Sequence, residues 1–271
     1  MATRFMVMWL VAMIGSACGP TAPRGLSTLD DDEPMLTQRP ALQMYLILTH
    51  QTEAMQDPRS IKEMWRAVHG ERAEFRDIRT LVRWAPAEYA IDIELDFANL
   101  PHPALPMKML QPSLRRLPSG VRQIGETAPL AVSVRSRSET LPAGEHLRLV
   151  GAAVLYMAEA FDGVIVDLMT RRAWTAEAWR TELSGRALTT AQTRLMVGQL
   201  SPNQYRLRSR GNIKFGLPDL ELDASATQLS LAKTRLAVAQ KQLMRTGRLT
   251  EENGQCLGNG YDGECLRVSM P

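Results

Sequence analysis

Alternating apolar and polar positions predict β-strands that bury one face. The clearest run is 88–97 (EYAIDIELDF), in which apolar and acidic residues alternate. The apolar residues are Ile91, Ile93, Leu95 and Phe97, and the acids are Asp92, Glu94 and Asp96. Because successive side chains of a strand point to opposite faces, this run predicts a half-buried strand with one solvated face.

Charged residues in other predicted strands have the same spacing of two. They are Arg135 and Arg137 in 128–138, Arg206, Arg208 and Arg210 in 204–210, and Asp219, Glu221 and Asp223 in 219–223. Opposite charges directly across antiparallel neighbours stabilise a sheet by about 0.2–1 kcal/mol per pair. We therefore predict that 206–210 pairs with 219–223 and that 135–137 lies near 92–96. These pairings would also neutralise the three acids of 92–96, whose spacing is too wide for one metal ion.

Longer apolar periodicities predict helices. They cover 60–70, 145–161, 176–183 and 226–246. The first begins with a capping box, Ser60 and Glu63, and ends at Gly70. Two further segments, 41–50 and 164–168, are almost entirely apolar and predict buried strands. The stretch 101–120 contains five prolines and predicts an irregular crossing with at most a short helix.

This order of elements predicts an α+β fold. We expect mainly antiparallel sheets with solvated charged faces, packed by amphipathic helices, in one globular domain over 39–247. Two similar halves, about 40–138 and 145–247, each contain an apolar strand, a helix and a charged strand pair. No sequence repeat supports a duplication.

The amino-acid composition indicates a folded core and argues against one class of partner. The chain has 271 residues, of which 45% are hydrophobic, so it can bury a real core. The formal net charge of +3 is too small to indicate a nucleic-acid partner.

The first 17 residues read as a secretory signal. Arg4 precedes the uncharged run 6–14, and small residues follow at Gly15, Ser16 and Ala17. A membrane-spanning helix needs roughly 20 apolar residues, about twice the length of this run. Two peptidases fit the site: one that cleaves ordinary secretory leaders before Cys18, and one that processes lipoproteins.

The stretch Gly15-Ser16-Ala17-Cys18 resembles the lipobox of bacterial lipoproteins, although Gly15 stands where an aliphatic residue is usual. The resemblance covers residues 1–18 alone. It implies that Cys18 is acylated and anchors the chain in a membrane. Gly19 and Pro20 after the cysteine imply the outer membrane, with the protein facing the periplasm or the surface. The segment 18–38 is rich in small and polar residues and predicts a flexible tether.

The other two cysteines predict a disulfide. Cys256 and Cys265 flank two turn signals, Asn259-Gly260 and Asp262-Gly263, which would bring the two side chains together. We therefore expect a stapled C-terminal hairpin in the tail 248–271. Cys18 then has no partner within the chain.

Catalytic motifs are absent from the sequence, and we predict no cofactor and no metal. The histidines at 50, 69, 102 and 146 lack metal-ligand spacing. The two catalytic candidates are Asp167, which ends a buried strand, and His50, which ends another and would act as a general base. The structural alternative for Asp167 is a turn cap or a pair with Arg171 or Arg172.

Two functions follow from these features. The first is a membrane-tethered envelope protein with a non-enzymatic binding or structural role and an envelope protein as partner. The second is an unrecognised envelope hydrolase with a site near Asp167 and His50.

Overall fold

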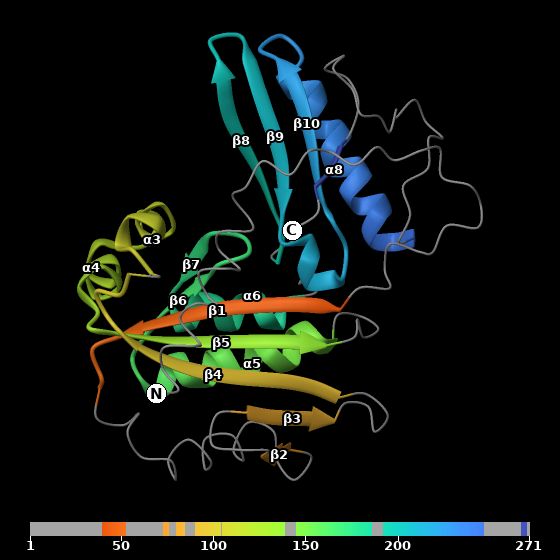
Figure 1. The fold of residues 1–271 in the computed structure, drawn as a ribbon. Helices are drawn as coiled ribbons and strands as arrows, with labels where there is room; N and C mark the ends of the chain where they lie inside the picture. The colour runs from red at the N-terminus through yellow and green to blue at the C-terminus, as the bar shows by residue number, and fades with distance from the viewer. Residues whose placement is uncertain are drawn as a thin grey trace. The chain divides into compact units, whose positions relative to one another are not determined.

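The chain forms two compact units in a computed structural model (Figure 1). The first unit spans Pro40–Gln192, and the second contains Thr193–Pro271. The structure describes residues 40–52, 73–75, 80–84, 90–103, 105–138, 145–185, 192–246 and 267–269, and for 73–75, 80–84, 90–92, 245–246 and 267–269 it describes the backbone alone. The predicted helix over 60–70 lies outside the described residues.

A seven-stranded antiparallel sheet forms the first unit, which we call the seven-stranded unit. Its strand order is β2-β3-β4-β5-β1-β6-β7. The strands are β1 (Ala41–Thr49), β2 (Ala73–Phe75), β3 (Thr80–Trp84), β4 (Ala90–Asn99), β5 (Leu130–Ser138), β6 (Val164–Asp167) and β7 (Arg172–Trp174). β1 lies between β5 and β6 and is almost entirely buried, as its apolar sequence predicts.

Two helices, α5 (Glu145–Ala160) and α6 (Ala176–Ser184), cover one face of this sheet (Figure 1). The apolar residues of α5 pack on alternate residues of β1, β4 and β5 in one core cluster. The helix residues of that cluster include Val150, Val154 and Met157. Trp179 of α6 is fully buried in it. This cluster is the hydrophobic core that holds α5 and α6 against the sheet.

The proline-rich stretch 101–120 contains one short helix and the start of a second. Helices α3 (Met107–Leu114) and α4 (Ser119–Thr127) pack against each other and against β6. Pro106 and Pro118 are the N-cap residues of the two helices, where their missing N–H groups cost nothing. The expectation of at most a short helix in 101–120 is met by the eight residues of α3, whereas α4, which begins at Ser119 and continues to Thr127, was not predicted.

The second unit, here the four-stranded unit, has strand order β11-β10-β9-β8. The strands are β8 (Arg194–Ser201), β9 (Gln204–Arg210), β10 (Asp219–Ser225) and β11 (Arg267–Ser269). The 3-10 helix η4 (Asn212–Phe215) connects β9 to β10, and helix α8 (Leu229–Thr246) packs on both strands. The predicted apolar stripe of α8 is buried at Ala232, Leu236, Ala239 and Leu243.

Both predicted charge ladders are confirmed by strand register. Arg206 and Arg208 of β9 lie across from Asp223 and Glu221 of β10. Arg206 donates to both carboxylate oxygens of Asp223, at 2.8 and 3.1 Å, and Arg208 forms an ion pair with Glu221.

In the seven-stranded unit, Glu94 and Asp92 of β4 lie across from Arg135 and Arg137 of β5. The Glu94 and Arg135 side chains form an ion pair at 3.1 Å. The register therefore supports the structural interpretation of the acids in 92–96.

The charged residues of the two ladders differ in how far they are exposed to solvent. The side chain of Glu221 is only 10% exposed and that of Arg135 only 13%. Pairing with a neighbour on the sheet replaces the hydration that each charge would lose on burial. The predicted solvated faces are thus present at Glu94, whose side chain is 48% exposed, while Arg135 and Glu221 are partly buried in their ion pairs.

The units do not divide the chain into the halves 40–138 and 145–247. β6 follows residue 145, yet it pairs with β1 in the same sheet. The boundary between the units instead lies between Gln192 and Thr193. Strand β8, which follows this boundary, was not predicted, because its sequence RLMVGQLS has no regular alternation.

Asp219 lies at the end of the acidic ladder of β10. Its carboxylate accepts a hydrogen bond from the Asn212 backbone N–H at 3.2 Å. Burial raises the pKa of Asp219 to about 6, against the opposing effects of that hydrogen bond and of the positive charges of Arg210 and Arg208. The folded protein therefore binds this proton more tightly than the unfolded chain does.

We predict that Asp219→Asn stabilises the protein at neutral pH but not in acid. As pH rises from about 4 to 6, the unfolded chain loses the Asp219 proton while the folded protein keeps it, so wild type loses about 3 kcal/mol of stability that the asparagine variant keeps. Asparagine also keeps an oxygen that can accept the Asn212 N–H bond. Urea unfolding at pH 4.5 and pH 7.5 measures the difference. An equal effect of the substitution at both pH values would contradict the prediction.

Candidate functional site

Asp167 lies at the end of β6 and is fully buried. Its carboxylate accepts hydrogen bonds from the Met169 N–H at 2.9 Å and from the Thr170 N–H at 3.3 Å. The Thr170 hydroxyl donates to its second oxygen at 2.6 Å. Asp167 thus caps the turn into β7, which is the structural alternative considered from the sequence.

His50 follows the last residue of β1 and is exposed. Its Nε2 lies 3.1 Å from the Thr127 hydroxyl at the end of α4. That hydroxyl donates to the Gln123 carbonyl oxygen at 2.8 Å, so it accepts from His50. His50 thus connects β1 to α4 through a polar surface contact.

The two catalytic candidates do not share a site. Asp167 pairs with Tyr45 across β1 and β6. His50 lies five residues farther along β1, which at about 3.3 Å per residue is about 16 Å away. A carboxylate and an imidazole at this separation cannot act on the same substrate bond.

A buried polar network that the sequence did not predict lies next to Asp167. The Tyr45 hydroxyl lies 2.9 Å from Gln192 Oε1 and 3.3 Å from Gln43 Oε1. Gln43 Nε2 donates to the His146 carbonyl oxygen at 3.2 Å. Gln43 was the available signal, because a glutamine within an apolar strand is polar where its neighbours are not.

Burial, and secondarily the charge of Asp167, raises the pKa of Tyr45 well above its usual range. Tyr45 therefore stays neutral and acts as a hydrogen-bond donor. All three polar side chains of the network are at most 2% exposed, so a solute cannot reach them without opening the core. The network ties β1 to the start of α5 and to the end of the unit at Gln192.

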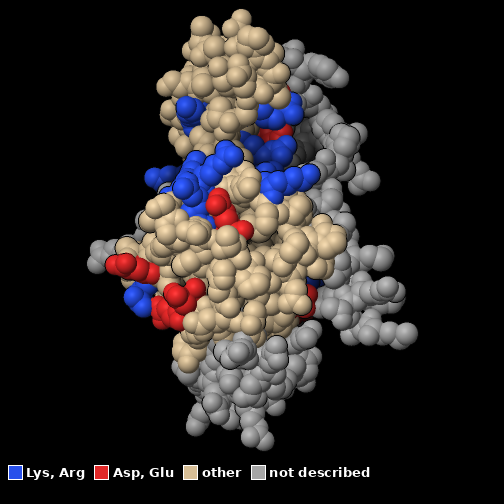
Figure 2. Space-filling model, turned by 90° about the vertical axis from the view of Figure 1, so that its left-hand side faces the viewer, with Lys and Arg blue, Asp and Glu red and all other residues tan. Residues whose placement is uncertain are grey.

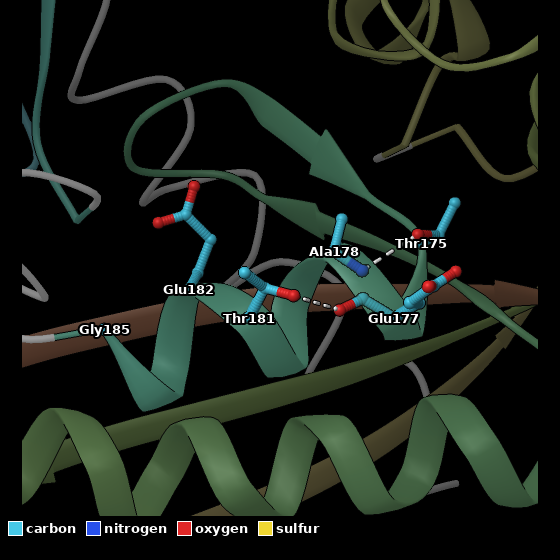
Figure 3. Close-up of a pocket in the computed structure, with 6 residues that line it drawn as sticks. All are labelled: Thr175, Glu177, Ala178, Thr181, Glu182 and Gly185. Carbon is cyan, nitrogen blue, oxygen red and sulfur yellow. Dashed lines mark hydrogen bonds between the residues drawn. The ribbon is translucent and has the colours of Figure 1, made fainter.

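A hollow of about 520 Å³ lies along α6 (Figure 3). It is lined by Thr175, Glu177, Ala178, Thr181, Glu182 and Gly185. Glu177 and Glu182 stand near opposite ends of the helix and point apart (Figure 3). The Thr175 and Thr181 hydroxyls are used in the helix itself, as N-cap and as donor to the Glu177 carbonyl oxygen. The hollow thus lacks converging polar groups.

The α3–α4 pair carries a set of basic residues that we call the basic helical surface. It consists of Lys108, Arg115, Arg116 and Arg122. Lys108, Arg115 and Arg116 are exposed, and Arg122 is half-buried. Figure 2 looks toward the side on which Figure 1 shows α3 and α4, and Lys and Arg side chains gather on this face. This surface was not predicted from the sequence, because at most a short helix was expected in 101–120 and α4 was not expected.

Metal-binding clusters and membrane-spanning helices are both lacking in the described part of the chain. Nowhere in that part do three or more His, Cys, Asp or Glu residues lie close enough together to hold a metal ion. Of the helices described, none has the length and apolar character needed to cross a membrane. Cys18, Cys256 and Cys265 lie outside the described residues, as does the leader.

No family model, curated protein or solved structure matches the chain. Function must therefore be inferred from the residues themselves, because a fold alone does not specify an activity. Two features bear on it. They are the lipobox-like leader of the sequence and the basic helical surface of the structure.

Proposed function

We propose that this protein is an exported lipoprotein of a bacterial envelope with a non-enzymatic binding or structural role. Acylated Cys18 anchors it in a membrane, the outer membrane being favoured by Gly19 and Pro20. Residues 18–38 act as the tether, and a disulfide between Cys256 and Cys265 staples the C-terminal hairpin. Its partners are the membrane and an envelope protein.

The leader supports the anchor. A charged start, an apolar run too short to span a membrane and small residues before Cys18 are typical of an exported leader, and Gly15-Ser16-Ala17-Cys18 resembles a lipobox in which Gly15 replaces the usual aliphatic residue. The count of three cysteines supports it further. If Cys256 and Cys265 pair, the remaining thiol has no partner in an oxidising compartment, and acylation accounts for it.

One observation carries the non-enzymatic part of the proposal. The Asp167 carboxylate accepts three hydrogen bonds from its own turn and is fully buried. A carboxylate that is buried and hydrogen-bonded in this way stabilises the turn, and a substrate could not reach it without opening the core. The separation of about 16 Å between Asp167 and His50 also argues against a shared catalytic site.

Metabolic labelling tests the anchor. Cells that express the protein are grown with labelled palmitate, and wild type is compared with Cys18→Ala. We expect label on the wild type alone, because the cysteine sulfur is the acylated atom in lipoproteins of this kind. An unlabelled wild type would contradict the proposal that Cys18 is acylated.

The mass of the protein purified from the same cells tests whether Cys256 and Cys265 form a disulfide. A Cys256–Cys265 bond makes the unreduced protein about two mass units lighter than the reduced one, since a disulfide forms by loss of two hydrogens. Two free thiols in the unreduced wild type would contradict the disulfide and leave the palmitate result unaffected.

A further inference from the structure

We propose that the basic helical surface binds the anionic headgroups of phospholipids in the membrane that carries the anchor. The proposal rests on the proposed function, because the Cys18 anchor is what brings this surface to the bilayer. The basic helical surface would be a second membrane contact beside the lipid.

Helix geometry directs these cations to solvent. Leu110 and Leu114 of α3 are buried, at 3% and 0% exposure. Lys108 and Arg115 are seven residues apart, about two helical turns, so they project from the same side of α3. That side is opposite the buried leucines, which leaves both charges in water.

Among the described residues, the cations of this surface have no carboxylate partner of the kind that the sheet arginines have. Arg135, Arg206 and Arg208 are each paired with a carboxylate across the strands. Within the described residues, by contrast, none of the four cations of the basic helical surface forms an ion pair. Glu126 is the one acid in the sequences of α3 and α4. The pair of helices therefore presents a net positive surface that an anionic partner would neutralise.

An exposed apolar side chain lies among these charges. Met109 follows Lys108 on α3 and is 39% exposed. Cations with an adjacent apolar side chain are the pattern of surfaces that lie at a bilayer interface, where the apolar group enters the headgroup region. A soluble anion would gain nothing from Met109, and this favours a lipid.

The tether is long enough for this contact. Twenty-one residues separate Cys18 from Pro40, where the described part begins. A chain of that length spans at most about 70 Å when fully extended. Pro40 precedes the nine residues of β1, which cover about 30 Å, and α4 contacts His50 just beyond the far end of that strand, so the extended tether is longer than the strand that separates its end from α4.

Vesicle sedimentation tests the proposal with the full chain as Cys18→Ser, which cannot be acylated on that residue. Vesicles of phosphatidylcholine mixed with phosphatidylglycerol are compared with vesicles of phosphatidylcholine alone. We expect binding to the anionic vesicles that weakens as salt is added. A basic residue near an anionic membrane contributes about a fivefold gain in affinity.

The decisive variant is Arg115→Glu/Arg116→Glu. Its control is Lys233→Glu/Lys241→Glu, which reverses two exposed lysines of α8 and changes the net charge by the same amount. We expect the first variant to lose about tenfold or more in affinity for anionic vesicles and the control to lose far less. The leader is identical in both, so its contribution cancels. Far-UV circular dichroism checks that each variant is folded.

Three outcomes would overturn the proposal. They are equal loss in the two variants, equal binding to neutral vesicles, and displacement by inorganic phosphate at constant ionic strength, which would indicate a discrete phosphate site. Failure of the anchor is seen separately, because it removes the palmitate label from the wild type without changing the vesicle result for Cys18→Ser.

Discussion

Replacing Trp179 with alanine is expected to lower the free energy of unfolding of the seven-stranded unit by about 4 kcal/mol. The side chain is fully buried, and its ring packs edge-on against Tyr45 at 5.3 Å and Trp174 at 4.9 Å between centroids. Its Nε1 also donates to the Gly151 carbonyl oxygen at 3.0 Å. Alanine removes the ring contacts and the indole hydrogen bond, and it leaves a cavity in the core.

Urea unfolding followed by far-UV circular dichroism measures this loss. Trp179→Phe is the matched control, because it keeps an aromatic ring and removes the indole N–H, so we expect a smaller loss of about 1–2 kcal/mol. Met109→Ala, at an exposed position, should change stability by less than about 0.5 kcal/mol. A Trp179→Ala protein as stable as Met109→Ala would show that Trp179 is not part of the core.

Replacing Asp167 with alanine is expected to cost about 3 kcal/mol. The substitution leaves the Met169 and Thr170 N–H groups and the Thr170 hydroxyl without their common acceptor. Thr170 is fully buried, so its polar groups cannot turn to water instead. The turn that joins β6 to β7 would lose its cap.

Asp167→Asn separates hydrogen bonding from charge. Asparagine keeps an acceptor oxygen for the backbone N–H groups, so we expect it to recover at least half of the stability lost in Asp167→Ala. The same unfolding experiment compares the two variants. Unchanged stability in Asp167→Ala would argue against the cap and would reopen a chemical role for this carboxylate.

The strand pairings were predictable because the sign and spacing of the charges on one strand indicate which other strand can lie beside it. Arg206 and Arg208 could be matched with Asp223 and Glu221 from their spacing alone, since alternation puts each charge on a known face. Arg135 could be placed beside Glu94 in the same way. This pairing also accounts for the acids of 92–96 without a metal ion.

Segments without a regular pattern of charged or apolar residues could not be assigned from the sequence. Strand β8 has no regular alternation and a bulge between Gln199 and Ser201, so its sequence carries no clear period. The helices α3 and α4 follow prolines that also occur in loops, and a proline at a helix start cannot be told from one in a turn by composition. The basic helical surface was missed for that reason.

Local sequence therefore determined the α+β class, most strands and helices, and which faces of the strands carry opposite charges. Those properties depend on residues two to four positions apart, which the chain alone displays. Tertiary structure decided that Asp167 caps a turn opposite the middle of β1, that His50 lies beyond the end of that strand, and that the four cations of the basic helical surface form no ion pair within the described region. These properties depend on which residues burial brings together, and burial is a property of the packed chain.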